Sequence, residues 1–155
     1  MPPPMRYLGI DLGDKRTGLA LGDDETRLAS PWKVVECSLA TPAGVERLLG
    51  LLAAAAAEAG RVEVVLGLPL NMDGSEGSPA ARARDIGARL AARTGLRVHY
   101  QDERLSTAAA DWRMSQSGLS RQQKKERRDA LAAAEVLSEF LRGLPERPES
   151  GRHRA

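Results

Sequence analysis

The stretch from residue 6 to residue 23, RYLGIDLGDKRTGLALGD, constrains the fold more than any other part of the chain. It consists of two apolar runs, residues 7–11 and 17–21, joined by a short polar turn at residues 13–16. The turn composition and the flanking apolar runs predict a β-hairpin. The first run ends on a carboxylate, Asp11, which is costly at the end of a buried strand unless another group uses it. The hairpin therefore indicates a functional role for Asp11, although an aspartate can also simply cap a turn.

The remainder of the chain predicts a third strand and then alternating helices and strands. Thr41 and Pro42 are typical of a helix start, and Gly95 is typical of a helix end. Three strands in close succession, followed by two strands that each come after a helix, predict an α/β fold. We expect a mixed five-stranded sheet, three strands antiparallel and two parallel, flanked by helices, with the first strand central. The expected further strands cover residues 30–37, 62–66 and 96–101, and the expected helices cover 42–59, 79–94, 106–118 and 129–142.

Length and composition restrict the possible classes of protein. The 155 residues suit one domain, which we expect over residues 6–142, with disordered tails at 1–5 and 143–155. A single cysteine, Cys37, excludes a disulfide framework and favours a reducing compartment. One cysteine and two histidines cannot form a usual zinc site. No apolar run approaches the length of a membrane span, and the start MPPPM lacks the features of a signal peptide, so we expect a cytoplasmic protein without membrane contact.

The net charge of the chain is only +2, so a surface that binds nucleic acid must come from local clustering of basic residues. A basic segment, residues 119–128, precedes the last helix, and we expect it to be a loop that contacts phosphates. Aromatic residues make up only 3% of the chain, so few bases can be bound by stacking. Recognition should therefore depend on backbone charge and shape, which fits branched or structured nucleic acid. The candidate nucleic-acid-binding residues are Lys15, Arg16, Asn71, Arg104, Arg121, Lys124, Lys125, Arg127 and Arg128.

Three carboxylates are expected to meet at one edge of the sheet. Asp11 and Glu103 follow the carboxyl ends of strands, where functional groups gather in such folds. Asp129 is expected in the first turn of the last helix, on the face that must cover the sheet. Three converging carboxylates repel one another, and hard divalent cations such as Mg²⁺ or Mn²⁺ relieve that conflict. Two such ions would suit phosphodiester hydrolysis.

Each acid also has a simpler interpretation. Glu103 could pair with Arg104 on the surface, and Asp102 competes with Glu103 for the metal role. Asp129 could be no more than a favourable charge near a helix N-terminus. From the residues alone, the choice between Asp102 and Glu103 stays open.

Four motifs in order resemble the YqgF/RuvX family, which belongs with the RuvC-like resolvases in the ribonuclease H-like superfamily. They are GIDLGDKRTGLAL, GLPLNMDGSEG, DERLST and the helix segment at 129–134, and the resemblance covers roughly residues 6–141. It implies a metal-dependent nuclease that acts on Holliday junctions or matures the 5′ end of pre-16S rRNA. By motif position, its catalytic and metal-binding acids fall on Asp11, Glu103 and Asp129. The wider superfamily places its second acid at the end of the fourth strand, whereas here that strand carries none and Glu103 takes the role.

Two further functions remain possible at this stage. The chain could be a non-catalytic nucleic-acid-binding module that retains the fold, although all three acids are present. It could be a nucleotide-binding phosphotransferase, but such enzymes need two duplicated domains. The sequence does not distinguish DNA from RNA. A resolvase cuts two symmetric strands, so we also expect a homodimer.

Overall fold

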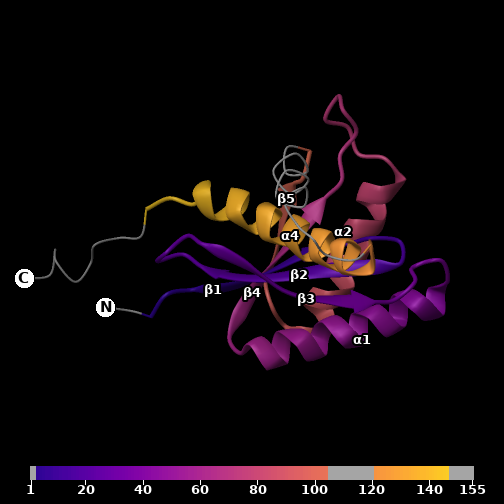
Figure 1. Ribbon diagram of the computed structural model, residues 1–155, viewed down its shortest axis with the longest axis horizontal. Helices are drawn as coiled ribbons and strands as arrows, with labels where there is room; N and C mark the ends of the chain where they lie inside the picture. The colour runs from indigo at the N-terminus through magenta and orange to yellow at the C-terminus, as the bar shows by residue number, and fades with distance from the viewer. Residues whose placement is uncertain (1–2, 105–120, 147–155) are drawn as a thin grey trace, which may run out of the picture.

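The computed structural model describes residues 3–104 and 121–146, with the backbone alone for residues 121–127 (Figure 1). The helix expected over residues 106–118 lies outside the described residues. The strands are β1 (Arg6–Asp11), β2 (Arg16–Asp23), β3 (Ala29–Glu36), β4 (Val62–Leu68) and β5 (Val98–Asp102), and the helices are α1 (Pro42–Ala59), α2 (Ser78–Thr94) and α4 (Arg121–Arg142).

The five strands form one sheet in the order β3-β2-β1-β4-β5. β1 pairs antiparallel with β2, and β2 pairs antiparallel with β3. β4 runs parallel to both β1 and β5. The predicted mixed sheet with β1 at its centre is therefore confirmed, and the carboxyl ends of β1, β4 and β5 point to one edge.

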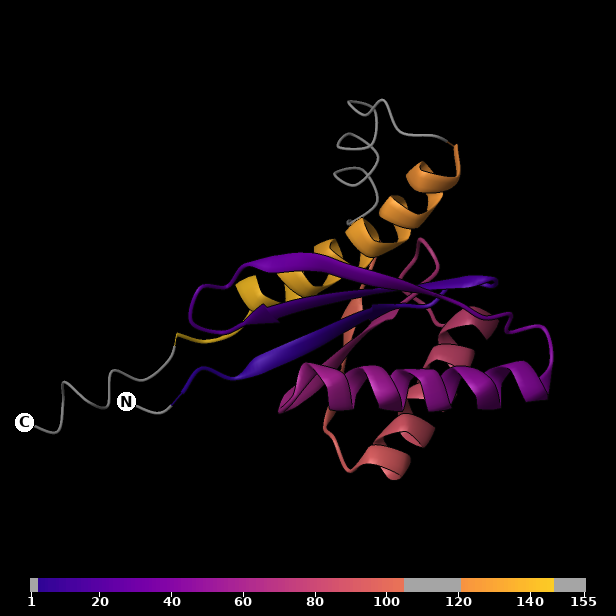
Figure 2. The ribbon, with the colours of Figure 1, turned by 60° about the horizontal axis from the view of Figure 1, so that its bottom comes forward.

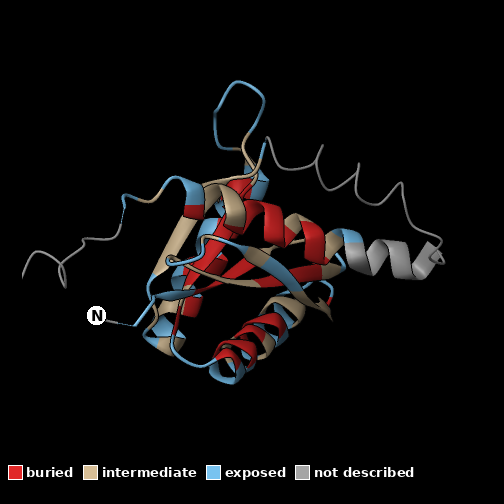
Figure 3. Ribbon diagram, turned by 60° about the vertical axis from the view of Figure 1, so that its left-hand side comes forward, coloured by how far each residue is buried: buried red, intermediate tan, exposed pale blue. Residues whose placement is uncertain are grey.

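Helices cover both faces of this sheet (Figure 2). α1 and α2 pack on one face, where alternate residues of β1 and β4, among them Leu8, Ile10 and Leu66, are fully buried. α4 packs on the opposite face, against Tyr7, Ala20 and a second set of buried side chains. Buried positions accordingly line the sheet-facing sides of the helices (Figure 3). The alternation of side chains thus divides β1, β2 and β4 between two separate cores.

Small residues let α4 lie unusually close to the strands. A Cβ atom placed on Gly18 in β2 would come within 1.9 Å of the backbone oxygen of Asp129 in α4. No side chain fits there, so glycine at this position is a packing requirement and not a matter of backbone conformation. The glycines of the hairpin sequence therefore form the surface on which α4 packs, although this helix is distant along the chain.

The start of α4 differs from the sequence prediction. Residues up to 128 were expected to form a basic loop, but the helix already begins at Arg121. The segment contains arginine, lysine, glutamine and glutamate without glycine or proline, and these residues favour a helix. Asp129 consequently lies in the third turn of α4, so the expected stabilisation by the helix N-terminus is wrong, although the residue does face the sheet.

The far end of α4 is held by the β2–β3 turn. Arg27, which has a positive φ of 57°, donates hydrogen bonds to the backbone oxygens of Leu141, Leu144 and Pro145 at 3.1, 2.8 and 2.7 Å. These contacts tie the last turn of α4, and the two residues Leu144 and Pro145 beyond it, to the β2–β3 turn. β2 and the turn that follows it thus contact α4 at two levels, at Asp129 and at the carboxyl end of the helix.

Within residues 3–104 and 121–146, no helix has both the length and the apolar character needed to cross a membrane.

Candidate active site

Asp11 and Glu103 meet at the carboxyl edge of the sheet, on the face covered by α4. Asp11 is the last residue of β1, and its side chain is hydrogen-bonded to that of Glu103. Burial, together with the negative charge of Glu103, this hydrogen bond and the charge of Asp129, raises the pKa of Asp11 from 3.8 to about 8. Such a carboxyl keeps its proton at neutral pH unless a positive charge takes the proton's place.

The strand register decides between the two adjacent acids that follow the fifth strand. Asp102 pairs with Leu68 on β4, so its side chain lies on the α1–α2 side, while the next residue returns to the α4 side with Asp11. Arg104 binds Asp102 at 2.7 Å and holds the pKa of this carboxyl below its usual range. The structure therefore brings Glu103, not Asp102, to Asp11.

Glycine at position 67 makes room for Glu103. A Cβ atom on Gly67 would lie 2.4 Å from Oε2 of Glu103, a contact that is too short to exist. The fourth strand thus carries no acid at its end but instead offers an open surface over which the acid of the neighbouring strand extends.

Asp129 approaches from α4 and is paired with a cation of the hairpin. Nε of Arg16, the first residue of β2, lies 3.1 Å from Oδ2 of Asp129. Both side chains are partly exposed, at 21% for Arg16 and 29% for Asp129. Asp129 is near enough to raise the pKa of Asp11 by its charge. The three predicted acids are therefore neighbours, but the third one is turned to an arginine.

The chemistry of these acids fits a hard divalent cation. All three offer carboxylate oxygens, and both burial and the neighbouring negative charges of Glu103 and Asp129 raise the pKa of Asp11, which a bound cation would counteract. Among the residues that the structure describes, however, no three histidine, cysteine, aspartate or glutamate side chains are already grouped closely enough to hold a metal ion. The site is thus suited in composition, with two acids in contact and the third held aside.

A cavity of about 310 Å³ lies at the hairpin turn, next to Asp129. Lys15 and Arg16 line it together with Asp129, as do Gly13 and Asp14. Asp14 is itself bound by Arg82 of α2 at 3.0 Å, so its charge is partly compensated. Two cations beside an acidic site provide a place for a phosphate group.

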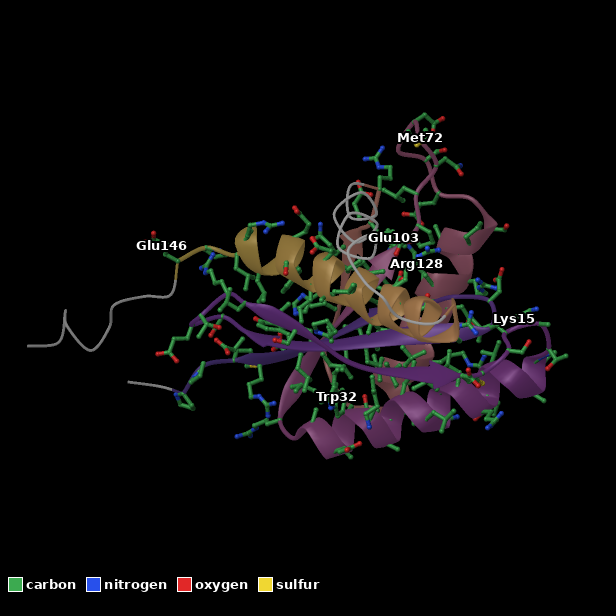
Figure 4. All side chains as sticks on the ribbon, in the orientation of Figure 1. Lys15, Trp32, Met72, Glu103, Arg128 and Glu146 are labelled. Carbon is green, nitrogen blue, oxygen red and sulfur yellow. The ribbon has the colours of Figure 1, made fainter. Side chains whose placement is uncertain are left out.

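The loop after β4 projects above this edge and carries an exposed methionine at its tip (Figure 4). Met72 is 90% exposed, and Arg104 donates a hydrogen bond to its backbone oxygen at 3.2 Å. The amide of Asn71 donates to Ser75 at 2.9 Å, so this predicted binding residue braces its own loop. Arg104 connects the loop to the strand end that bears Glu103, a role that the sequence did not indicate.

The remaining predicted binding residues belong to the first turns of α4. Arg128 is exposed and lies one position before Asp129. The side chains of Arg121, Lys124, Lys125 and Arg127 lie outside the described residues, so their contact with phosphate stays a prediction.

Comparison with known proteins gives consistent similarities. The family RuvX, described as Holliday junction resolvase, matches residues 5–143. A protein of Anaeromyxobacter sp. named "Putative pre-16S rRNA nuclease" is 46% identical over 139 residues, covering 90% of this chain and 98% of its own. A protein of the same name from Lactococcus lactis subsp. lactis is 40% identical over 137 residues, covering 88% and 93%. The structure of Thermus thermophilus RuvC in complex with a Holliday junction substrate has a TM-score of 0.58 at 20% identity, covering 89% of this chain and 94% of that one, which shows a shared ribonuclease H-like fold.

Proposed function

Because the chain belongs to the RuvX family, we propose that it is a metal-dependent endonuclease that hydrolyses phosphodiester bonds in structured nucleic acid. The observation that supports this most directly is the meeting of Asp11 with Glu103, near Asp129, at one edge of the sheet, where burial and the charges of these two acids raise the pKa of Asp11 to about 8. A fold that needed these acids only for structure would not accumulate their charge at a partly open edge.

In this proposal, Asp11, Glu103 and Asp129 hold Mg²⁺ or Mn²⁺, with two ions as the expected number. Bound ions of this kind would activate a water and stabilise the leaving oxygen. The protein's own part is to position the scissile phosphate. Lys15, Arg16 and the exposed Arg128 surround the acidic edge and can bind the phosphates on either side of it.

We place precursor 16S rRNA first among the substrates, because the relatives that carry this name are 46% and 40% identical over nearly the whole chain. A four-way DNA junction is the second candidate, supported by the family description. A homodimer would let a junction be cut on two symmetric strands, and the cytoplasm would hold either substrate.

The test is cleavage of a 5′-extended precursor 16S rRNA fragment and of a four-way DNA junction, side by side, with Mg²⁺ or Mn²⁺. Wild type should cut at least one of them, while Asp11→Asn and Glu103→Gln should each lower the rate by 100-fold or more, since charge stabilisation of this kind contributes about 3 kcal/mol or more. Asp102→Asn is the matched control, because it removes an adjacent carboxylate on the other side of the strand and should leave most of the activity.

Equal cleavage by wild type and Asp11→Asn would refute the catalytic proposal. It would leave a nucleic-acid-binding module whose carboxylates are vestigial. Equal losses for Asp102→Asn and Glu103→Gln would refute the assignment of the second acid.

A further inference from the structure

Arg16 occupies the position of a counter-ion to the third acid. Its guanidinium group lies 3.1 Å from Asp129, while Asp11 and Glu103 are paired with each other through a hydrogen bond. Among the described residues, no three of these ligand types are grouped for a metal ion. Arg16 therefore compensates with one positive charge what a divalent cation would compensate with two.

The ion pair is not required to hold α4 in place. The helix is already packed against β2 at this level, where Gly18 allows the backbone of Asp129 to approach directly. Arg27 anchors the carboxyl end of α4 through three hydrogen bonds, and a buried apolar cluster that includes Ala133 and Leu137 lies between Asp129 and that end. A purely structural bridge at Asp129 would thus add little to contacts that exist without it.

The pair is also inexpensive to break. With side-chain exposures of 21% and 29%, it is a partly solvated bridge of the kind worth at most about 1 kcal/mol. The guanidinium group of Arg16 also has an alternative position, because Arg16 lines the cavity of about 310 Å³ next to Lys15. A guanidinium group binds a phosphate through two parallel hydrogen bonds, which a single carboxylate oxygen does not satisfy.

From these observations we infer that Arg16 is an exchanging residue: it leaves Asp129 when a divalent cation binds the acids, and it then binds a substrate phosphate in the cavity lined by Gly13, Asp14, Lys15, Arg16 and Asp129. This inference rests on the proposed function. The exchange makes cation binding and phosphate binding mutually favourable. A cation on Asp129 frees Arg16 for the phosphate, and a phosphate that binds Arg16 frees Asp129 for the cation. Couplings of this type typically change affinity by 5- to 150-fold.

Isothermal titration with Mn²⁺, without nucleic acid, tests the first half. Arg16→Gln removes the competitor of the cation and should bind Mn²⁺ at least 5-fold more tightly than wild type. Lys15→Gln removes the same charge one residue earlier and should change the affinity less than 2-fold, because the ion pair that the cation must displace is the one between Arg16 and Asp129. Equal Mn²⁺ affinity of Arg16→Gln and wild type would overturn the inference.

A measurement on the unaltered protein avoids any folding defect of the variant. The Nε–H resonance of Arg16 should move when Mg²⁺ is added and should move again when a phosphorothioate-protected four-way junction follows. The same resonance in Asp11→Asn should not respond at that Mg²⁺ concentration. A resonance that stays fixed while Mg²⁺ binds would show a permanent structural bridge, and a missing second shift would refute the phosphate contact.

Failure of the inference can be told from failure of the proposed function. If wild type binds neither Mn²⁺ nor Mg²⁺, the metal-dependent nuclease proposal falls and this inference falls with it. If the cation binds and the nucleic acid is cut while Arg16 remains on Asp129, only the exchange is refuted.

Discussion

Replacing Asp11 with asparagine is expected to stabilise the metal-free protein at neutral and alkaline pH, although it removes a proposed catalytic residue. The pKa of Asp11 is raised from 3.8 to about 8 in the folded state, because the side chain is buried and faces two other carboxyls. The folded protein therefore binds this proton more tightly than the unfolded chain does. The stabilisation that the protonated Asp11 side chain contributes to the folded state is complete below pH 4, is lost progressively as the pH rises and is gone above pH 8.

The size of the effect follows from the shift. Each unit of pKa corresponds to about 1.4 kcal/mol, so the full shift would give a limit of roughly 6 kcal/mol. The side chain of Asp11 retains some contact with solvent at the sheet edge, so we take about half of this limit, roughly 3 kcal/mol. Asparagine keeps the shape and can still donate to Glu103 without carrying a charge. The variant should match wild type at pH 4 and exceed its free energy of unfolding by about 3 kcal/mol at pH 8.5.

Urea denaturation in the presence of EDTA, followed by circular dichroism from pH 4 to pH 8.5, measures this difference. Asp102→Asn is the internal control with the opposite sign, since Arg104 lowers the pKa of Asp102. That pair stabilises the folded protein above the unfolded pKa and loses its effect on acidification, so the control should be less stable by at most about 1 kcal/mol at pH 7. A difference between Asp11→Asn and wild type that does not change with pH would refute the electrostatic account of the site.

Two further substitutions test the packing around the acids. Gly67→Ala places a Cβ 2.4 Å from Oε2 of Glu103, so the carboxylate must move away from Asp11. Cleavage should then drop at least 10-fold while the circular dichroism spectrum stays unchanged. Gly50→Ala, whose Cβ would meet only Arg93 at 3.9 Å, is the matched control and should keep full activity. Activity of Gly67→Ala within 2-fold of wild type would contradict the placement of Glu103. Thr17→Val should raise the free energy of unfolding by about 1 kcal/mol in urea titrations, because the buried hydroxyl of Thr17 has no hydrogen-bond partner among the described residues, whereas a loss of stability would indicate a partner.

The sequence predicted the sheet because its signals are local. Turn residues, apolar runs and helix caps such as Thr41, whose hydroxyl accepts from the backbone of Gly44 at 3.0 Å, each act within a few residues. The alternation along β5 could also have settled the second acid, because Val98 and Tyr100 belong to the α1–α2 core and place Asp102 on their side. The start of α4 was missed because charge was given more weight than the helix preference of the same residues.

Other features could not be derived from local patterns. Arg16 and Asp129 are 113 positions apart, and nothing near either residue indicates their pairing. The same holds for Gly67, whose missing side chain matters only because Glu103 of another strand extends over it. Close approaches between distant segments depend on the assembled fold, so they become visible only when it is known.

The packing of α4 on the glycine-lined face of the sheet also has a consequence for the order in which the protein folds during synthesis. Helix α4 follows strands β1, β2, β4 and β5 and helices α1 and α2 along the chain. The core between the sheet and helices α1 and α2 can therefore form first. The opposite face, with Tyr7 and Ala20, stays uncovered until α4 emerges from the ribosome. Asp129 is carried by that last helix, so a nascent chain that has already joined Asp11 to Glu103 still holds an incomplete acidic site.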